Sequence, residues 1–141
     1  MMNNHIKIQF LSKSANEGFA RVAAAAFVSQ KDVTIEQISD IKTAVSEAVT
    51  NAIVHGYEGM TGYITLDCKY EDDKVYIEVS DCGRGIADVA KARTPLYTSK
   101  PDLERSGMGF TVMETFMDSV EVISALGLGT TVKMMKNLSG N

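Results

Sequence analysis

The sequence SEAVTNAIVHG, residues 46–56, forms the end of a longer segment with helical periodicity. A capping box of Thr34 and Gln37 predicts where this helix begins, and Gly56 predicts where it ends. At about 100° per residue, one arc of the helix is apolar and is its predicted core face. The residues of this face are Ile38, Ile41, Val45, Ala48, Val49 and Ala52.

A polar stripe runs along the same helix. Glu47, Asn51 and His55 are spaced four residues apart, and their line drifts from opposite the core face toward its edge. Glu47 and Asn51 are separated by about 6 Å along the axis. A stripe in this position could line a pocket beside the core. On this helix alone an ordinary solvated face is the simpler interpretation, with His55 favourable to the C-terminal dipole.

The flanking segments predict the remaining elements. On the N-terminal side, alternation over residues 6–10 predicts a strand, and Ser14 with Glu17 forms a second capping box that opens a helix. The apolar positions with helical spacing in that helix are Phe19, Val22, Ala23, Ala26 and Phe27. On the C-terminal side, alternation predicts strands around 64–70, 75–79, 120–124 and 130–135, with a helix after Gly109.

The order of these elements indicates a fold class. The helices are grouped rather than alternating with every strand, which favours an α+β two-layer sandwich with a mixed or antiparallel sheet and helices on one face. A length of 141 residues fits a single domain over 1–141. The segment from about 88 to 107 holds both prolines and is expected to be a lid-like loop.

Composition excludes several classes of protein. The apolar fraction of 45% and charged fraction of 23% are ordinary for a globular chain. A net charge of −4 argues against non-specific binding to DNA or to an anionic membrane. There is no apolar run long enough to span a bilayer and no signal-peptide pattern, and two isolated cysteines suit a reducing cytoplasm. No pair of His and Cys residues has zinc-site spacing.

The pattern Asp81-x-Gly83-x-Gly85 stands at the end of a predicted strand. Glycines there permit positive φ and a close approach of ligand to backbone. An aspartate beside them can accept a hydrogen bond from the exocyclic amine of adenine and reject guanine, which has a carbonyl there. By itself the pattern also fits a simple turn capped by aspartate.

A second glycine pair, Gly107-x-Gly109, precedes a predicted helix. The bare N–H groups at a helix N-terminus suit phosphate, and Arg105 just upstream could add charge. A flexible loop ending at an N-cap explains the pair equally well. The Rossmann fingerprint, the Walker loop and the motifs of ordinary protein kinases are absent.

Taken in order, these motifs resemble the GHKL ATP-binding superfamily. The resemblance rests on 47–55, Asp81-x-Gly83-x-Gly85, Gly107-x-Gly109 and Gly129-Thr130-Thr131, and it covers nearly the whole chain. Within the superfamily, residues 46–55 and 94–110 resemble the serine-kinase anti-sigma factors, especially those of sporulation. The anti-sigma-B kinases of the general stress response remain an open alternative.

The resemblance implies a role for each motif residue. Glu47 would be the general base toward the acceptor hydroxyl, and Asn51 would bind the Mg²⁺ that bridges the phosphates. Arg105 would face the terminal phosphate or the protein substrate. The remaining nucleotide contacts would come from Asp81 at the adenine amine, Gly83 and Gly85 beside the ring, Gly107 and Gly109 at the phosphates, and Thr130 through water. Arg21, off the core face of the first helix, would meet protein partners.

The implied function is that of a cytoplasmic, homodimeric anti-sigma factor and Mg-ATP-dependent protein serine kinase. It would hold a sporulation sigma factor (sigma-F type) inactive and phosphorylate a STAS-type anti-anti-sigma protein on serine, leaving ADP, without binding DNA or a membrane. One alternative is an ATP-binding partner-switching module without phosphotransfer, because the pocket alone does not make a kinase. Another is the catalytic domain of a histidine kinase. The lack of phosphoacceptor dimerisation helices before the domain argues against this alternative. The sequence leaves open the identity of the sigma factor, the dimer surface and the effect of ADP against ATP.

Overall fold

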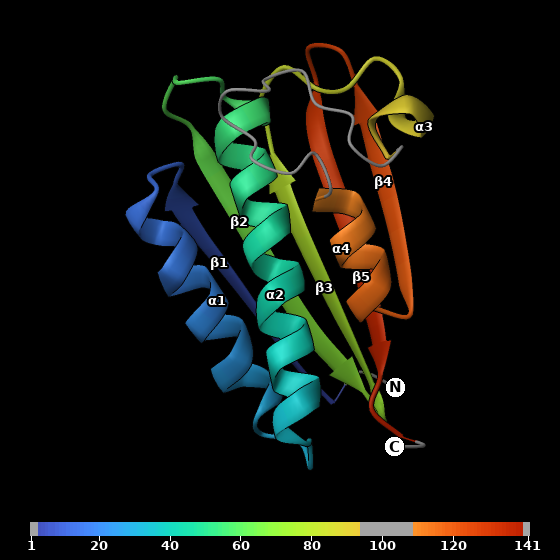
Figure 1. Ribbon diagram of the computed structural model, residues 1–141. Helices are drawn as coiled ribbons and strands as arrows, with labels where there is room; N and C mark the ends of the chain where they lie inside the picture. Colours follow the sequence, from blue (N-terminus) through green and yellow to red (C-terminus); the bar gives the residue numbers. More distant parts are fainter. Residues whose placement is uncertain (1–2, 94–108, 140–141) are drawn as a thin grey trace.

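The computed structural model describes residues 3–93 and 109–139. They form a two-layer α+β sandwich, in which a five-stranded sheet of order β1-β2-β3-β5-β4 carries its helices on one face (Figure 1). The strands are β1 (Asn4–Leu11), β2 (Tyr63–Glu71), β3 (Lys74–Asp81), β4 (Ser119–Ala125) and β5 (Gly129–Asn137). The helices are α1 (Ala15–Val28), α2 (Ile35–Asn51), the π-helical turn η1 (Ala52–Gly56), α3 (Val89–Ala92) and α4 (Gly109–Phe116). Every strand pairing is antiparallel, so the predicted fold class is confirmed.

Alternation along the central strands decides which face of the sheet is covered. The buried face of β2 and β3 consists of Ile64, Leu66, Cys68, Val75, Ile77 and Val79. Leu66 is paired with Val79 and Cys68 with Ile77, so both strands place their apolar sets under the helices. Asp81 is in phase with Val79, two residues before it, and is therefore also turned toward the helical layer at the end of β3.

The central helix α2 packs between α1 and α4 over the sheet (Figure 1). Its predicted N-terminal capping box is confirmed: Gln37 N donates to Thr34 Oγ1 at 3.0 Å, and Thr34 N donates to Gln37 Oε1 at 2.9 Å. The predicted core face is buried except for Ile38, which is half-buried. Among the helices in the described ranges, none has the length and apolar character needed to cross a membrane.

The first helix differs from its prediction in two respects. Ser14 precedes α1 but has helical backbone angles, and its side chain forms no capping hydrogen bond; the carboxylate of Glu17 instead accepts from Ser46 Oγ at 2.5 Å. Of the apolar positions noted in the sequence, Phe19 and Val22 are 55% and 57% exposed. The buried face consists of Ala20, Ala24, Phe27 and Val28. A helix that is apolar on several sides gives no unique core face: the prediction is right for Phe27, whereas the alanines that are fully buried are Ala20 and Ala24.

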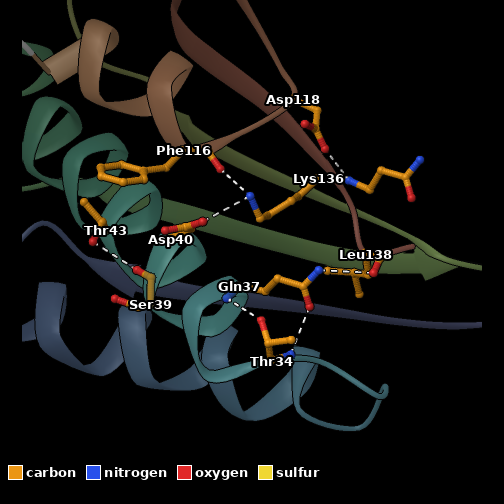
Figure 2. A network of polar contacts seen from close by, with 10 residues as sticks. Thr34, Gln37, Ser39, Asp40, Thr43, Phe116, Asp118, Lys136 and Leu138 are labelled. Atoms are coloured by element: carbon orange, nitrogen blue, oxygen red, sulfur yellow. Dashed lines mark hydrogen bonds and ion pairs between the residues drawn. The ribbon is translucent and has the colours of Figure 1, made fainter. Parts of the chain in front are cut away.

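A polar network joins α2, α4 and β5 (Figure 2). Lys136 Nζ donates to the carbonyl of Phe116, the last residue of α4, at 2.7 Å and lies 3.3 Å from Asp40 Oδ2. Gln37 Nε2 donates to the carbonyl of Leu138 at 3.1 Å. These contacts fix the C-terminal strand to the first turns of α2, about 16 Å along that helix from Asn51.

Candidate functional site

A cavity of about 500 Å³ opens between the end of α2, the end of β3, the start of β5 and the start of α4. Among its lining residues are six that the sequence motifs singled out: Asn51, His55, Asp81, Gly85, Gly109 and Thr130. Its apolar walls include Ala48, Ala52, Val79, Ile86, Leu126 and Val132. An apolar cavity with a few convergent polar groups is typical of small-molecule and cofactor sites.

The carboxylate of Asp81 is a buried charged group in the wall of this cavity, at 8% exposure. Its Oδ1 accepts a hydrogen bond from Gly83 N at 2.9 Å. Burial raises the pKa of the carboxyl above its ordinary value, although the N–H groups of Gly83 and Thr130 act in the opposite direction. A desolvated acceptor in an apolar cavity favours a ligand that brings a hydrogen-bond donor to it.

The helix that carries the polar stripe ends in a π-turn, which the sequence did not predict. Tyr57 N donates to the carbonyl of Ala52, five residues earlier, at 3.1 Å. The carbonyl of Gly56 accepts from Arg84 N at 2.8 Å, and a Cβ on Gly83 would lie 2.1 Å from that same oxygen. Gly83 therefore gives η1 room against the turn after β3, and it is not among the cavity-lining residues. Single π-turns are frequent at functional sites.

Gly85 and Gly129 lie where two backbone segments come too close together for a side chain to fit. Gly85 has φ +76°, and a Cβ there would lie 2.0 Å from the carbonyl oxygen of Ala125. Gly129 has φ +87°, and a Cβ there would lie 2.1 Å from the carbonyl oxygen of Asp81. The turn between β4 and β5 therefore rests directly on the turn that follows β3.

Thr130 lies opposite Asp81 across the β3–β5 pair and is buried. Its hydroxyl is 2.8 Å from Ser124 Oγ, which also accepts from Ile86 N at 2.7 Å. Thr130 thus lines the cavity from β5. Ser124, on the neighbouring edge strand β4, accepts the hydrogen bond that connects this strand to the segment after Gly85. The polar end of the cavity is therefore formed by β3 and β5 and is supported by a hydrogen bond from β4.

Two residues of the polar stripe on α2, Glu47 and Asn51, lie close to Gly109, the first residue of α4. A Cβ on Gly109 would lie 3.1 Å from Asn51 Nδ2 and 3.4 Å from Glu47 Oε2, so both side chains face Gly109. Asn51 and His55 line the cavity, whereas Glu47 lines an adjoining groove. The polar stripe therefore borders both the cavity and the groove, in agreement with the expectation that it could line a pocket beside the core.

Asn51 also suits Mg²⁺. Its amide oxygen is the kind of hard ligand that Mg²⁺ accepts, and this ion takes few protein ligands when phosphates and waters fill its other positions. Within residues 3–93 and 109–139, no cluster of three or more His, Cys, Asp or Glu residues could hold a metal ion by itself. The donor set thus fits an ion that arrives with a phosphate ligand.

The adjoining groove has a volume of about 570 Å³ and lies along α1 and α2. Its lining residues are Arg21, Ile35, Ile38, Ser39, Lys42, Thr43, Ser46 and Glu47. Arg21 Nε is buried without a hydrogen-bond partner among the described atoms, and it lies 3.8 Å from Glu17 Oε2. Ile35 is 88% exposed at the start of α2. The groove therefore combines basic and exposed apolar side chains.

Two of the predicted site residues, Arg105 and Gly107, lie outside the described residues, as does most of the expected lid-like loop. The described part of that loop contains α3, whose first turn is capped by Asp88 Oδ1 accepting from Lys91 N at 3.0 Å. Asp88 and Lys91 line the cavity. Neither was singled out from the sequence, because polar residues in an irregular segment carry no periodic signal.

The two cysteines are free and differ in environment. Cys68 is in the core, and burial raises the pKa of its thiol to about 12. Cys82 is exposed in the turn after Asp81. Cys68 is therefore a protonated packing residue at neutral pH.

Comparison with known proteins places the chain among ATPase domains and anti-sigma factors. The family model described as the histidine kinase-like ATPase domain matches residues 11–136. The chain is 57% identical over 140 residues to an anti-sigma F factor of Clostridium botulinum (strain Eklund 17B / Type B), covering 99% of this chain and 98% of the relative. It is 58% identical over 139 residues to an anti-sigma F factor of Clostridium novyi (strain NT), covering 98% and 97%.

Among solved structures, the crystal structure of the RsbU and RsbW domains of Rv1364c from Mycobacterium tuberculosis is similar, with a TM-score of 0.70 at 20% sequence identity. The match covers 99% of this chain and 34% of the other, so the chain spans about a third of that protein. At this level of identity the similarity concerns the fold.

Proposed function

Since the chain belongs to the family of histidine kinase-like ATPase domains and, within it, to the anti-sigma F factors, we propose that it binds a sporulation sigma factor and holds it inactive. In the same proposal residues 1–141 act in the cytoplasm as one Mg-ATP-dependent protein serine kinase domain. Its protein substrate is a STAS-type anti-anti-sigma protein, and its products are ADP and the phosphoserine form of that protein.

The observation that carries the proposal is the relation of Glu47 and Asn51 to Gly109. Both side chains face this residue, with Asn51 on the cavity side and Glu47 on the groove side. Asp81 lies at the buried end of the same cavity. A nucleotide with its base at Asp81 and its phosphates toward Asn51 would therefore present its terminal phosphate near the boundary with the groove.

The proposed transfer uses the chain's own residues for binding and proton transfer. Glu47 accepts the proton of the substrate serine hydroxyl, whose oxygen bonds to the γ-phosphorus as the bond to the β-phosphate oxygen breaks and ADP departs. Asn51 holds Mg²⁺, which supplies charge neutralisation at the phosphates. Gly107 and Gly109 supply backbone N–H groups to the phosphates, and Arg105 faces the terminal phosphate or the protein substrate.

The groove supports the proposal for protein partners. Within the described part of the chain, the buried Nε–H of Arg21 has no hydrogen-bond acceptor, and Ile35 presents an exposed apolar surface at the other end of the groove. Arginine and exposed apolar residues of this kind are common in protein interfaces. We place partner contact at Arg21, in a homodimer, with bound ATP or ADP changing the affinity for each partner.

The phosphotransfer test uses Mg-ATP labelled at the γ-phosphate and a candidate anti-anti-sigma protein. Label on the wild-type substrate, with none on its acceptor Ser→Ala form, is the expected result. Acid-labile label on this chain itself would instead support a histidine kinase. Nucleotide binding without transfer would support a partner-switching module that lacks kinase activity.

The anti-sigma test is separate. A sporulation sigma factor is immobilised and challenged with the chain in the presence of Mg-ATP or Mg-ADP. Retention that depends on the nucleotide is the expected result. No retention with either nucleotide would contradict the proposal for sigma factor binding, whatever the result of the labelling experiment.

A further inference from the structure

The turn after β3 uses all three of its successive N–H groups. Cys82 N donates to Tyr57 Oη at 2.9 Å, Gly83 N to Asp81 Oδ1 at 2.9 Å, and Arg84 N to the carbonyl of Gly56 at 2.8 Å. Two of these three acceptors belong to Gly56 and Tyr57, at the end of η1. The orientation of the Asp81 carboxylate therefore depends on a turn that is held from outside the strand.

Tyr57 is itself fixed in three ways. Its N–H donates to the carbonyl of Ala52, and its hydroxyl donates to the carbonyl of Tyr63 at 2.5 Å. Its ring lies against Gly62, where a Cβ would be 2.2 Å from Tyr57 Cε1. The hydroxyl is thus a donor toward β2 and an acceptor for Cys82 N, and no other group on that ring can do both.

The protonation state of Tyr57 agrees with this arrangement. Desolvation raises the pKa of its hydroxyl above the ordinary value. The hydrogen bond from Cys82 N acts in the opposite direction, but the nearby Asp81 carboxylate adds to the rise, and the net pKa stays raised. The hydroxyl therefore keeps its proton at neutral pH and can donate to Tyr63. Tyr57 does not line the cavity, so any effect on a ligand must pass through the turn.

We propose that Tyr57 is a positioning residue for base recognition, whose hydroxyl holds the 82–84 turn so that the Asp81 carboxylate stays aligned with the exocyclic amine of an adenine nucleotide. The inference rests on the proposed function, in which Asp81 accepts from that amine. It adds a specificity-determining residue that does not touch the ligand. Its consequence is a loss of discrimination between purines rather than a loss of phosphate binding.

The experiment compares Mg-ADP with Mg-IDP by titration calorimetry. The two nucleotides have identical phosphates, but inosine has a carbonyl where adenine has its amine. Tyr57→Phe removes only the hydroxyl. It should weaken the binding of Mg-ADP by about three- to tenfold, the scale of one lost neutral hydrogen bond, and leave the affinity for Mg-IDP unchanged. Tyr70→Phe is the matched control, because the Tyr70 hydroxyl donates to Gln30 Oε1 at 3.0 Å, away from the cavity.

A double mutant tests whether Tyr57 acts through Asp81. In the Asp81→Asn background, Tyr57→Phe should cause no further loss of ADP affinity, because residues that act through one contact are not additive. Gly62→Ala provides a second variant, since it displaces the Tyr57 ring while leaving the hydroxyl in the chain, and it should lower the preference for ADP in the same way. Thermal unfolding of each variant confirms that the protein measured is folded.

The outcomes separate the inference from the proposed function. If the wild type does not prefer ADP over IDP, the assignment of adenine to Asp81 fails, and the inference fails with it. If the wild type discriminates but Tyr57→Phe binds both nucleotides as well as the wild type, or weakens both equally, only the inference is overturned. An additive loss in the Asp81→Asn background also overturns it.

Discussion

The Cα of Gly56 lies against the carboxylate of Asp81: a Cβ at position 56 would be 2.9 Å from both Cγ and Oδ1 of Asp81. Gly56 does not have positive φ, so alanine meets no backbone strain there. Gly56→Ala should therefore act by displacing the carboxylate. Overpacking should lower the free energy of unfolding by about 1–3 kcal/mol, and the displaced carboxylate should weaken the binding of Mg-ADP. Calorimetry and urea unfolding measure the two effects.

Gly18→Ala is the control for this substitution. Gly18 is inside α1, and the nearest atom to a Cβ there would be Arg21 Nη2 at 3.8 Å. Alanine at this position should stabilise the protein by up to about 1 kcal/mol through helix propensity and leave Mg-ADP binding unchanged. Equal ADP affinity in Gly56→Ala and wild type would show that the contact with Asp81 does not set nucleotide binding.

Asp81→Asn keeps the size of the side chain and removes its charge. Because the lost contact is a hydrogen bond to an ionised group, Mg-ADP binding should weaken by about 1.5–3 kcal/mol. Mg-IDP binding should change much less, since inosine offers no amine at that place. An ADP affinity equal to that of the wild type would remove Asp81 from the base-recognition site.

The raised pKa of Asp81 gives this variant a pH dependence. A carboxyl with a higher pKa in the folded than in the unfolded state favours folding below the unfolded pKa, and this contribution is lost as pH rises through the folded pKa. Relative to the wild type, Asp81→Asn should therefore be most stable at neutral pH, with the advantage shrinking in acid. Thermal unfolding of both proteins over this range measures it, and an advantage that grows in acid would contradict the assignment.

How far the sequence predicts the fold depends on whether a residue belongs to a regular pattern. Asp81 continues the alternation of Val75, Ile77 and Val79, so its burial at the end of a strand follows from the sequence. The core face of α2 follows equally from its apolar spacing. In α1 the apolar residues surround too much of the helix to define one core face. Phe27 is buried as predicted, but Phe19 is exposed because α1 packs through the face that contains Ala20 and Ala24.

The candidate site shows the same division. Asn51, Asp81, Gly85, Gly109 and Thr130 were found from motifs at the ends of elements, and the structure brings them to one cavity. The roles of Gly56 and Tyr57 depend on a π-turn whose bond spans five residues, and no hydrophobic period reports it. Apolar wall residues such as Leu126 come from turns and could be located only by the tertiary fold.

Arg21→Ala should separate partner binding from nucleotide binding. Arginine is enriched among the few interface residues whose truncation costs 2 kcal/mol or more, so affinity for the sigma factor should fall by about 30-fold. Mg-ADP affinity should not change, because Arg21 lines the groove and not the cavity. Surface plasmon resonance with the immobilised sigma factor measures the first and calorimetry the second.

The control for Arg21 is Lys31→Ala. Lys31 also carries a positive charge but lies after the end of α1, where its Nζ is 5.1 Å from the centre of the Tyr70 ring. Its removal lowers the net charge by the same amount and should leave sigma factor affinity unchanged. An equal loss in both variants would indicate a general charge effect, and no loss in Arg21→Ala would place the partner surface elsewhere.

The network around Lys136 predicts a substitution that affects stability alone (Figure 2). Lys136→Met removes the hydrogen bond to the Phe116 carbonyl and leaves Asp40 without this partner. Because both side chains are largely buried, the loss should be about 1.5–3 kcal/mol in the free energy of unfolding. Asp40→Asn completes a double-mutant cycle, and nucleotide affinity should be unchanged in all members. An additive cycle would show that the two residues do not interact in solution.

Glu47→Gln tests the proposed chemistry most directly. Glutamine fills the same space beside Gly109 but cannot take a proton from the acceptor serine, so Mg-ADP affinity should be retained while phosphotransfer slows by about 10²–10⁴-fold. Glu121→Gln, on an exposed position of the edge strand β4, removes an equal charge and should transfer at the wild-type rate. Single-turnover transfer from γ-labelled ATP to the anti-anti-sigma protein measures both. Transfer at the wild-type rate in Glu47→Gln would mean that another group accepts the proton. A loss of nucleotide affinity would instead show that Glu47 contributes to phosphate binding.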